Sequence, residues 1–279
     1  MSVDLHCHTK MSDGSVGIDE IIFLAKKMNV DTLAVTDHDT FAGAKRAKVI
    51  GQRHGVNVIM GAEFSAFDYR RAKNIHILCY LCDNPDRLEG LCKKSSEYRK
   101  KDTIQMLHKI MKFYPISPEM VCKKAQGSTN IFKNHIMQAI MDAGYSSVNY
   151  SKVFDKLFNP VDGLAKTQAK YPDVCDVINQ IHMAGGVAVL AHPNLYDNLE
   201  SVEDLVKCGL DGIEVWTPYA DNEKTEHIIN LADKYNLVKT GGSDFHGMYS
   251  KSVCPVGSCT TPKEQLENLI KRKNNLFNF

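Results

Sequence analysis

The chain has 279 residues, enough for one large domain that buries a sizeable core without disulfides or a structural metal ion. Its 34 Lys and Arg residues nearly balance its 33 Asp and Glu residues, which argues against a strong overall attraction to nucleic acids or membranes. No apolar run is long enough to cross a bilayer, and the first residues do not resemble a secretory leader. We therefore expect a cytoplasmic protein.

Nine cysteines are scattered along the chain, which favours reduced thiols over a disulfide framework. Cys79 and Cys82 form a CxxC pair inside an apolar, strand-like run, whereas a redox-active pair of this kind usually starts a helix. We therefore expect both to be ordinary buried cysteines.

Short apolar runs alternate with helical patterns in the first 83 residues. In the segment 18–28, for example, the apolar side chains recur on one helix face. The predicted elements are, in chain order, a strand at 3–5, a helix at 18–28, a strand at 32–36, a helix at 40–54, and strands at 56–60 and 75–81.

The alternation of strands and helices stops between residues 84 and 170. Helical patterns occupy 89–113, 118–125 and 131–143, and no strong strand candidate separates them. We expect residues 84–170 to form a helical insertion that caps a barrel domain built from 1–83 and 171–279.

The alternation returns in the last third of the chain. It predicts helices at 174–184, 202–208 and 222–235, and strands at 187–191, 212–215 and 237–240. Such β-α alternation is typical of a parallel sheet covered by helices. Seven strand candidates favour a closed or nearly closed α/β barrel, with a doubly wound open sheet as the alternative.

Side chains that bind metal ions stand at or near the end of almost every predicted strand, where the active site of a βα barrel lies. His76 fits this rule least well, because apolar residues continue after it. The candidate ligands are His6, His8, Asp13, His38, Glu63, His76, His192, Asp244 and His246.

The spacing and the chemistry of these side chains point to a multinuclear centre. His6 and His8 are two residues apart, so in a strand both imidazoles point to the same side. A mixture of imidazoles and carboxylates suits zinc, manganese or iron, and not a calcium cage or a cysteine-rich zinc site. Nine ligands are too many for one ion, so we expect two or three ions with Glu63 as the shared carboxylate.

Two further carboxylates stand close to these motifs. Asp37 either holds a ligand histidine or serves as a turn residue. Glu214, within the sixth predicted strand, is interpreted as structural.

The motifs DLHCHTKMSDG, AVTDHDT, GAEFS, NIHIL, VLAHP, GIEVW and GGSDFHG follow one another along the chain. Together they resemble the PHP (polymerase and histidinol phosphatase) family of the amidohydrolase superfamily. The resemblance implies a distorted (β/α)7 barrel with a trinuclear site. It implies a first ion held by His6, His8, Glu63 and Asp244, a second by Asp13, His38 and His246, and a third by Glu63, His76 and His192.

The insertion resembles that of stand-alone bacterial members, which act as nucleotide phosphatases or as 5′-to-3′ exonucleases. The segments SSEYRKKDTIQML and KNHIMQAIMDAG carry this resemblance and contain Arg99 and His135. Asn134 replaces the usual proline, Lys133 lies near the usual arginine, and Cys79 replaces a usual glycine. These departures leave the metal ligands intact and bear on substrate specificity.

Arg99, His135 and Asp244 are the candidate catalytic and substrate-binding residues. A guanidinium can hold a phosphate with two hydrogen bonds, and His135 lies near a predicted helix N-terminus, where anions are favoured. We expect both to contact the substrate phosphate. Asp244 is expected to orient or deprotonate the water that attacks.

The sequence thus predicts a metal-dependent phosphoric ester hydrolase that uses metal-bound hydroxide. The favoured substrate is a small nucleotide, such as a nucleoside monophosphate or a 3′,5′-bisphosphate. The alternative is a 5′-to-3′ exonuclease on short single-stranded RNA or DNA, which the near-neutral charge disfavours. Histidinol phosphate hydrolysis and a non-catalytic metal-binding domain are less favoured, because of the cap pattern and the complete ligand set.

Overall fold

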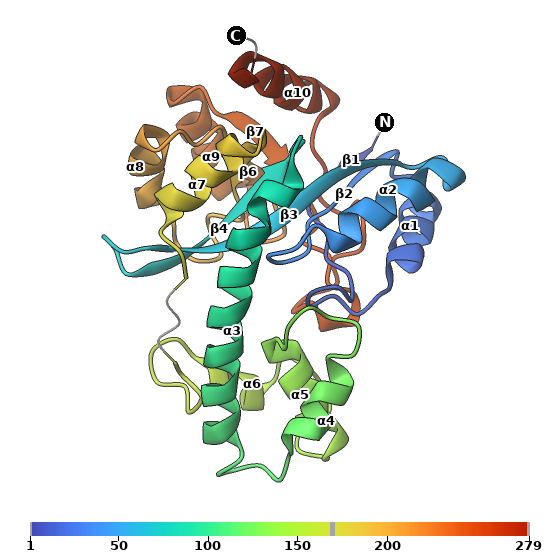
Figure 1. The fold of residues 1–279 in the computed structure, drawn as a ribbon, viewed down its shortest axis with the longest axis vertical. Coiled ribbons are helices and arrows are strands. Elements are labelled where there is room, and N and C mark those ends of the chain that lie inside the picture. Colours follow the sequence, from blue (N-terminus) through green and yellow to red (C-terminus); the bar gives the residue numbers. More distant parts are fainter. Residues whose placement is uncertain (1, 168–170, 278–279) are drawn as a thin grey trace.

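The computed structural model describes residues 2–167 and 171–277. One seven-stranded sheet, with its strands in sequence order, curls into a nearly closed barrel (Figure 1). The strands are β1 (Val3–Asp4), β2 (Thr32–Val35), β3 (Asn57–Asp68), β4 (Lys73–Tyr80), β5 (Val187–Leu190), β6 (Gly212–Trp216) and β7 (Val238–Gly241).

The chain segments that carry the first and last strands meet, which confirms the barrel and rules out the open doubly wound sheet. Leu5 N donates to Gly241 O at 3.2 Å, and Cys7 bridges Phe245 in parallel. A Cβ atom on Gly242 would lie 2.4 Å from the backbone nitrogen of His6, so only glycine allows this approach.

The prediction of a wholly parallel sheet is wrong at β4. This strand runs antiparallel to both β3 and β5. Residues 69–72 join β3 to β4 as a hairpin, and without a crossover helix the chain must reverse direction.

Strand β3 is also much longer than the predicted segment 56–60. Ala62, Phe64 and Ala66 belong to a buried hydrophobic cluster, whereas the alternate residues Glu63 and Ser65 contact polar groups at the barrel mouth. This period of two continues the strand beyond the predicted end. Glu63 therefore lies within β3 and not after it.

Helices cover the outside of the barrel. Helices α1 (Ile18–Lys27) and α2 (Ala42–His54) lie beside the first three strands, and α7 (Val174–Met183), α8 (Val202–Lys207) and α9 (Asn222–Lys234) lie on the other side (Figure 1). Short 3-10 turns occupy Leu199–Ser201 and Gly247–Tyr249. No helix within 2–167 and 171–277 is long and apolar enough to cross a membrane.

Helix α10 (Lys263–Phe277), which the sequence analysis did not predict, closes the barrel end opposite the insertion (Figure 1). Its residues Leu266 and Leu269 join a buried cluster with Leu78 and Val238 from the strands and with Leu5, directly after β1. The interior at this end is therefore filled with apolar side chains, and the polar groups gather at the other end.

The region between β4 and α7 is helical. The 3-10 turn Pro85–Leu88 leads into the long helix α3 (Glu89–Ile110), and α4 (Pro118–Lys124), α5 (Lys133–Asp142) and α6 (Lys152–Phe158) pack beside its far half (Figure 1). Helix α6 was not predicted. These helices share a hydrophobic cluster of their own, formed from residues between Met106 and Ala165. Residues 168–170 of the predicted insertion lie outside the described residues.

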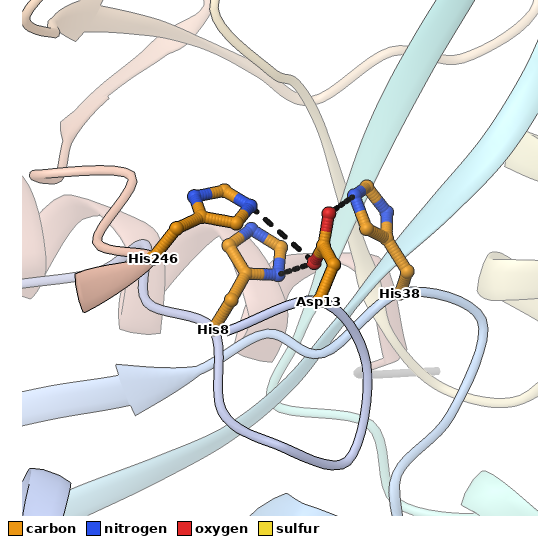
Figure 2. Close-up of side chains that lie close together, drawn as sticks. All are labelled: His8, Asp13, His38 and His246. Atoms are coloured by element: carbon orange, nitrogen blue, oxygen red, sulfur yellow. Dashed lines mark ion pairs between the residues drawn. The ribbon is translucent and has the colours of Figure 1, made fainter. Parts of the chain in front are cut away.

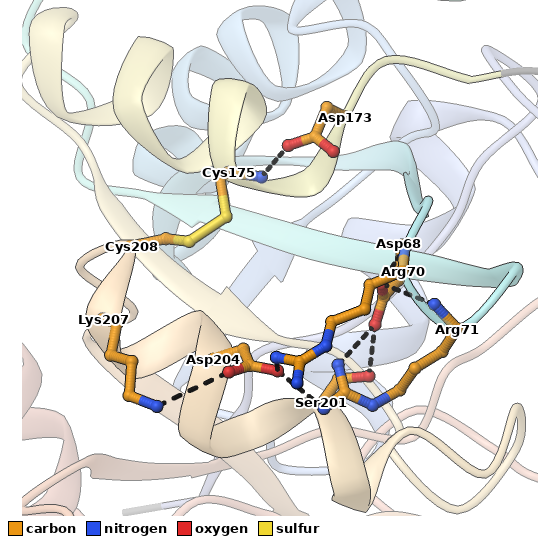
Figure 3. The surroundings of a disulfide bond; sticks show 9 residues. All are labelled: Asp68, Arg70, Arg71, Asp173, Cys175, Ser201, Asp204, Lys207 and Cys208. Carbon is orange, nitrogen blue, oxygen red and sulfur yellow. Dashed lines mark hydrogen bonds and ion pairs between the residues drawn. A yellow bond between two sulfur atoms is a disulfide. The ribbon is translucent and has the colours of Figure 1, made fainter.

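A disulfide joins Cys175 in α7 to Cys208 directly after α8, with Cα atoms 5.3 Å apart (Figure 3). The expectation that all cysteines are reduced is therefore wrong for this pair. The other seven cysteines are free, and Cys79 and Cys82 are buried as expected. The local sequence around Cys175 and Cys208 carries no pairing signal, because their contact depends on how two helices pack.

The disulfide predicts a specific thiol count. In denatured, unreduced protein, titration should find seven free thiols, and nine after reduction. Reduction should lower the free energy of unfolding by about 2–4 kcal/mol, because the bond constrains the unfolded chain. Urea titrations with and without reductant would measure this. Cys175→Ser should abolish the effect of reductant on the free energy of unfolding. Cys122→Ser, which changes an exposed free cysteine, should not abolish it. A count of nine free thiols before reduction would contradict the disulfide.

Candidate metal centre

The nine predicted metal ligands converge at the barrel mouth that faces the insertion. Their ligand atoms form four overlapping groups in which all atoms lie within 4.8 Å of one another. Figure 2 shows the group around Asp13, whose carboxylate reaches three histidines. The groups are His8, Asp13, His38 and His246; His6, His8 and Asp244; His6, Glu63 and His192; and His38, Glu63 and His76.

The antiparallel direction of β4 explains the position of His76. In a parallel strand, a residue near the start would lie at the barrel end away from the mouth. Because β4 is reversed, its first half lies at the mouth, and His76 pairs with Ser65 of β3. His76 Nδ1 therefore comes within 2.8 Å of Glu63 Oε1.

Glu63 lies at the centre of the site and is 1% exposed. Its Oε1 is also 2.8 Å from His192 Nε2. Its Oε2 lies 3.4 Å from His6 Nε2, 3.2 Å from His8 Nε2 and 3.2 Å from His38 Nδ1. One carboxylate thus touches five imidazoles, which is the arrangement expected of a ligand shared between ions.

Backbone conformation turns two of the ligands into the mouth. His192 follows β5 with φ 24°, and Asp244 follows β7 with φ 47°. Positive φ is uncommon outside glycine and costs conformational energy, so the surrounding structure must hold these residues in place.

Several side-chain atoms of the candidate ligands are buried without a hydrogen-bond partner among the described residues. They are His8 Nδ1, Asp13 Oδ1, His38 Nδ1, Glu63 Oε2, His192 Nδ1 and Asp244 Oδ1. Leaving such atoms unpaired is costly. Ligand atoms that share one ion at about 2.1 Å lie roughly 3–3.5 Å apart, close to the spacings around Glu63. Both observations fit divalent cations at this position.

The protonation states of the carboxylates and of His38 suit cation binding. Burial alone would raise the pKa values of Asp13, Glu63 and Asp244, but the surrounding histidines outweigh it and hold all three well below the usual range. Burial holds the pKa of His38 well below its usual value. Near neutral pH the carboxylates are therefore charged, and His38 offers a lone pair. At His6, His8 and His246 burial would lower the pKa, but nearby carboxylates outweigh it and raise the pKa, so a bound cation would displace protons there.

Glu214 contacts His6 and His192, whereas the sequence analysis interpreted it as structural. Its carboxylate oxygens lie 3.1 and 3.2 Å from His6 Nδ1, and Oε2 accepts from the backbone nitrogen of His192 at 2.8 Å. A proton on His6 Nδ1 leaves Nε2 free to face the other ligands. Glu214 therefore orients His6.

Asp37 does not contact a ligand histidine through a hydrogen bond. Its carboxylate accepts from Thr9 N, Thr9 Oγ1 and Ser12 Oγ, each at 2.7 Å. These contacts fold the loop between His8 and Asp13, so Asp37 fixes the path of the chain that carries both.

Arg99 reaches the mouth from α3 and is held rigidly. Its Nη2 donates to Asp39 Oδ2 at 2.9 Å and to Ser65 Oγ at 2.6 Å. The guanidinium lies 4.5 Å from the ring centre of Phe132, which in turn stacks on His38. Arg99 Nε is buried with no hydrogen-bond partner in the described chain. Arg99 therefore lies beside the cluster of candidate metal ligands, and its Nε–H remains available to donate to a substrate.

His135 lies in the first turn of α5 and, like Arg99, packs against the ring of Phe132. Its Nδ1 accepts from the backbone nitrogen of Phe132 at 3.1 Å, which places a proton on Nε2 when the ring is neutral. Burial lowers the pKa of His135, which favours that neutral form. His135 can thus donate one hydrogen bond to a substrate.

Two tyrosines at the mouth were missed by the sequence analysis. Tyr219 donates to Asp244 Oδ2 at 2.6 Å. The ring of Tyr196 packs edge-on against His76 and His192, at 5.1 and 5.6 Å between ring centres. Both lie in irregular loops, where hydrophobic periodicity predicts nothing about side-chain position. The one sequence feature that could have indicated them is their place a few residues after the VLAHP and GIEVW motifs.

Comparison with known proteins gives a consistent result. The PHP domain family model matches residues 4–184. A phosphoribosyl 1,2-cyclic phosphate 1,2-diphosphodiesterase of Eggerthella lenta is 36% identical over 90% of this chain and 96% of its own. A 5′-3′ exoribonuclease of Haemophilus influenzae is 27% identical over 87% of this chain and 89% of its own.

A solved structure has the same architecture. It is a predicted metal-dependent phosphoesterase of Bifidobacterium adolescentis, with a TM-score of 0.86 and 26% identity. The match covers 97% of this chain and 96% of that chain, so it includes the helical insertion as well as the barrel.

The contact between Glu214 and His6 predicts a loss of metal affinity. Glu214→Gln should weaken Mn²⁺ binding about 10- to 100-fold, because the charge that orients His6 is lost. Calorimetric titration of chelator-stripped protein would measure this. Glu203→Gln, on the exposed surface of α8, is the matched control. Equal affinities in Glu214→Gln and the unsubstituted protein would contradict the orienting role.

Proposed function

The chain belongs to the PHP domain family and is a metal-dependent phosphoesterase, and we propose that its substrate is a small phosphorylated nucleotide or ribose phosphate. The observation that carries this proposal is the position of Arg99 and His135 beside the carboxylate–histidine cluster. Two groups that can bind phosphate, the proposed multinuclear cation site and a guanidinium, thus lie next to each other beside the cap.

We propose that two or three divalent ions bind at the mouth, with Mn²⁺, Zn²⁺ or Fe²⁺ as candidates. Bound cations at such a site act as Lewis acids on the phosphoryl group and lower the pKa of water. The residues that would hold them are His6, His8, Asp13, His38, Glu63, His76, His192, Asp244 and His246.

We assign the remaining steps of binding and orientation to three side chains. Asp244 would hold a cation through Oδ1 and so orient the attacking water beside it. Arg99 binds phosphate oxygens, and because Asp39 and Ser65 already fix its guanidinium, little conformational entropy is lost on binding. His135 donates from Nε2 to the same anion. Most of the candidate site residues are buried, and exclusion of bulk water strengthens such contacts.

The small-substrate proposal is supported by the relative from Eggerthella lenta, whose name describes a phosphorylated ribose as substrate. The near-neutral charge of the chain also favours a small anion over a polyanion. We further propose that the protein acts in the cytoplasm, because seven of its nine cysteines are free thiols.

A 5′-to-3′ exonuclease is the second candidate. The relative from Haemophilus influenzae has this activity by name. Lys93, Lys94, Lys100 and Lys101 are exposed on α3, the helix that carries Arg99, and could follow the backbone of a short single strand.

One experiment separates these two substrate classes. Chelator-stripped protein is reloaded with Mn²⁺, and phosphate release is measured from nucleoside monophosphates, 3′,5′-bisphosphates and phosphoribosyl cyclic phosphate, alongside shortening of 5′-phosphorylated oligonucleotides. We expect the small substrates to be turned over faster. Much faster oligonucleotide shortening would favour the exonuclease, and no turnover of any of them would overturn the proposal.

Asp244→Asn is expected to reduce kcat on the order of 10²–10⁴-fold, because a neutral amide would hold the cation and orient the attacking water less well than the carboxylate. The thermal unfolding of the metal-free variant should stay close to that of the unsubstituted protein, since side-chain shape is kept. Asp162→Asn, on the exposed surface of the cap, controls for the loss of one carboxylate. Near-normal turnover in Asp244→Asn would refute the role.

Arg99→Lys should raise KM roughly 10- to 100-fold, because a lysine cannot reproduce a fixed, charge-assisted hydrogen bond to phosphate. Steady-state kinetics on the best small substrate would measure it. Lys100→Met, the exposed neighbour on the same helix, should leave KM for that substrate unchanged. An unaltered KM in Arg99→Lys would exclude Arg99 from phosphate binding.

A further inference from the structure

The two oxygens of Asp244 have different surroundings. Oδ1 lies 3.4 Å from His6 Nε2 and 3.2 Å from His8 Nε2, and it has no hydrogen-bond partner among the described residues. Oδ2 accepts a hydrogen bond from the hydroxyl of Tyr219 at 2.6 Å. One oxygen is thus directed to the metal-ligand cluster, and the other is occupied by a tyrosine.

We propose that Tyr219 is a positioning residue of the metal centre, which occupies Asp244 Oδ2 and so reserves Oδ1 for a divalent cation. The inference rests on the proposed role of Asp244 as a metal ligand. A free carboxylate can rotate, or bind one ion with both oxygens. The Tyr219 hydrogen bond disfavours both alternatives and leaves a single oxygen directed at the cluster.

Tyr219 is itself held in place, as this role requires. It lies in the loop after β6, where its backbone nitrogen donates to Thr217 Oγ1 at 3.3 Å. A turn closes behind it, with Ala220 N donating to Thr217 O at 3.4 Å. The ring of Tyr219 also packs edge-on against His192, with 6.0 Å between ring centres.

These contacts connect three neighbouring strands. Tyr219 follows β6, Asp244 follows β7 and His192 follows β5. A side chain in the middle therefore sets the position of a ligand on either side, by a hydrogen bond to one and a ring contact to the other. The backbone of Asp244, with φ 47°, gains a side-chain anchor that opposes relaxation to an ordinary conformation.

The test measures metal binding without any substrate. Tyr219→Phe keeps the ring and removes the hydroxyl, so Mn²⁺ affinity of the chelator-stripped protein should fall about tenfold by calorimetry. Kinetically, kcat should fall more than KM rises. Tyr235→Phe, which removes an exposed tyrosine hydroxyl bonded to Glu203 on the surface, should change neither quantity.

A double-substitution cycle assigns the effect to Asp244. In an Asp244→Asn background, Tyr219→Phe should change Mn²⁺ affinity less than twofold, because the carboxylate it positions is absent. A full tenfold loss in that background would show that Tyr219 acts elsewhere and would overturn the inference. The melting temperature of each metal-free variant shows whether the fold is intact.

Two other outcomes would also overturn the inference. One is unchanged Mn²⁺ affinity in Tyr219→Phe, and the other is a rise in KM alone, which would make Tyr219 a substrate contact. Failure of the proposed function looks different. An unsubstituted protein that hydrolyses none of the panel, yet loses Mn²⁺ affinity when Tyr219 is changed, would refute the substrate proposal and keep this inference.

Discussion

The contact of one buried carboxylate with five imidazoles governs the architecture of this protein. Glu63 is 1% exposed, and an ionised group at that depth is tolerated only when opposite charge or strong hydrogen bonding surrounds it. These histidines belong to four different strands or the segments that follow them, and the curvature of the sheet brings them together around Glu63. Gly242 permits the close approach between the first and last segments of the barrel, and α10 covers the opposite barrel end with apolar side chains.

The same constraint gives a reason for the irregular parts of the sheet. Strand β3 continues to Asp68, and its period of two places Glu63 and Ser65 on one face at the mouth. Reversal of β4 brings the start of that strand to the mouth, so that His76 meets Glu63. A regular parallel barrel would have placed His76 at the opposite end, among the apolar side chains below α10.

Local sequence patterns predicted the parts of this molecule that depend on local chemistry. The β-α alternation and the ligands after the strands follow from periodicity and from the rule that active sites lie at strand ends. The contact between His6 and Glu214 joins residues 208 positions apart, and the Tyr219–Asp244 bond depends on two adjacent loops. The disulfide between Cys175 and Cys208 likewise depends on helix packing. Such contacts follow from the tertiary arrangement, which no window of sequence contains.

The cap and the metal-ligand loop form one continuous hydrogen-bonded unit. Asn134 Nδ2 donates to the backbone oxygen of Asp13 at 3.4 Å, and Asn149 Nδ2 donates to Asn134 Oδ1 at 2.9 Å. Ser128 Oγ adds a bond to Ser12 O at 2.6 Å. A proline at position 134 would have no side-chain donor for this contact.

This coupling has a consequence for recognition. The net charge of the whole chain is close to zero, so it cannot select an anion by its overall field. Under the proposed function, selection arises locally, where the cap presents Arg99 and the barrel presents the candidate metal ligands. Because the cap is bonded to the loop that carries Asp13, the fold sets the distance between Arg99 and these ligands. If the proposed function holds, the fold favours substrates whose phosphate groups match that distance, and Asn134 helps to set it through its bond to Asp13.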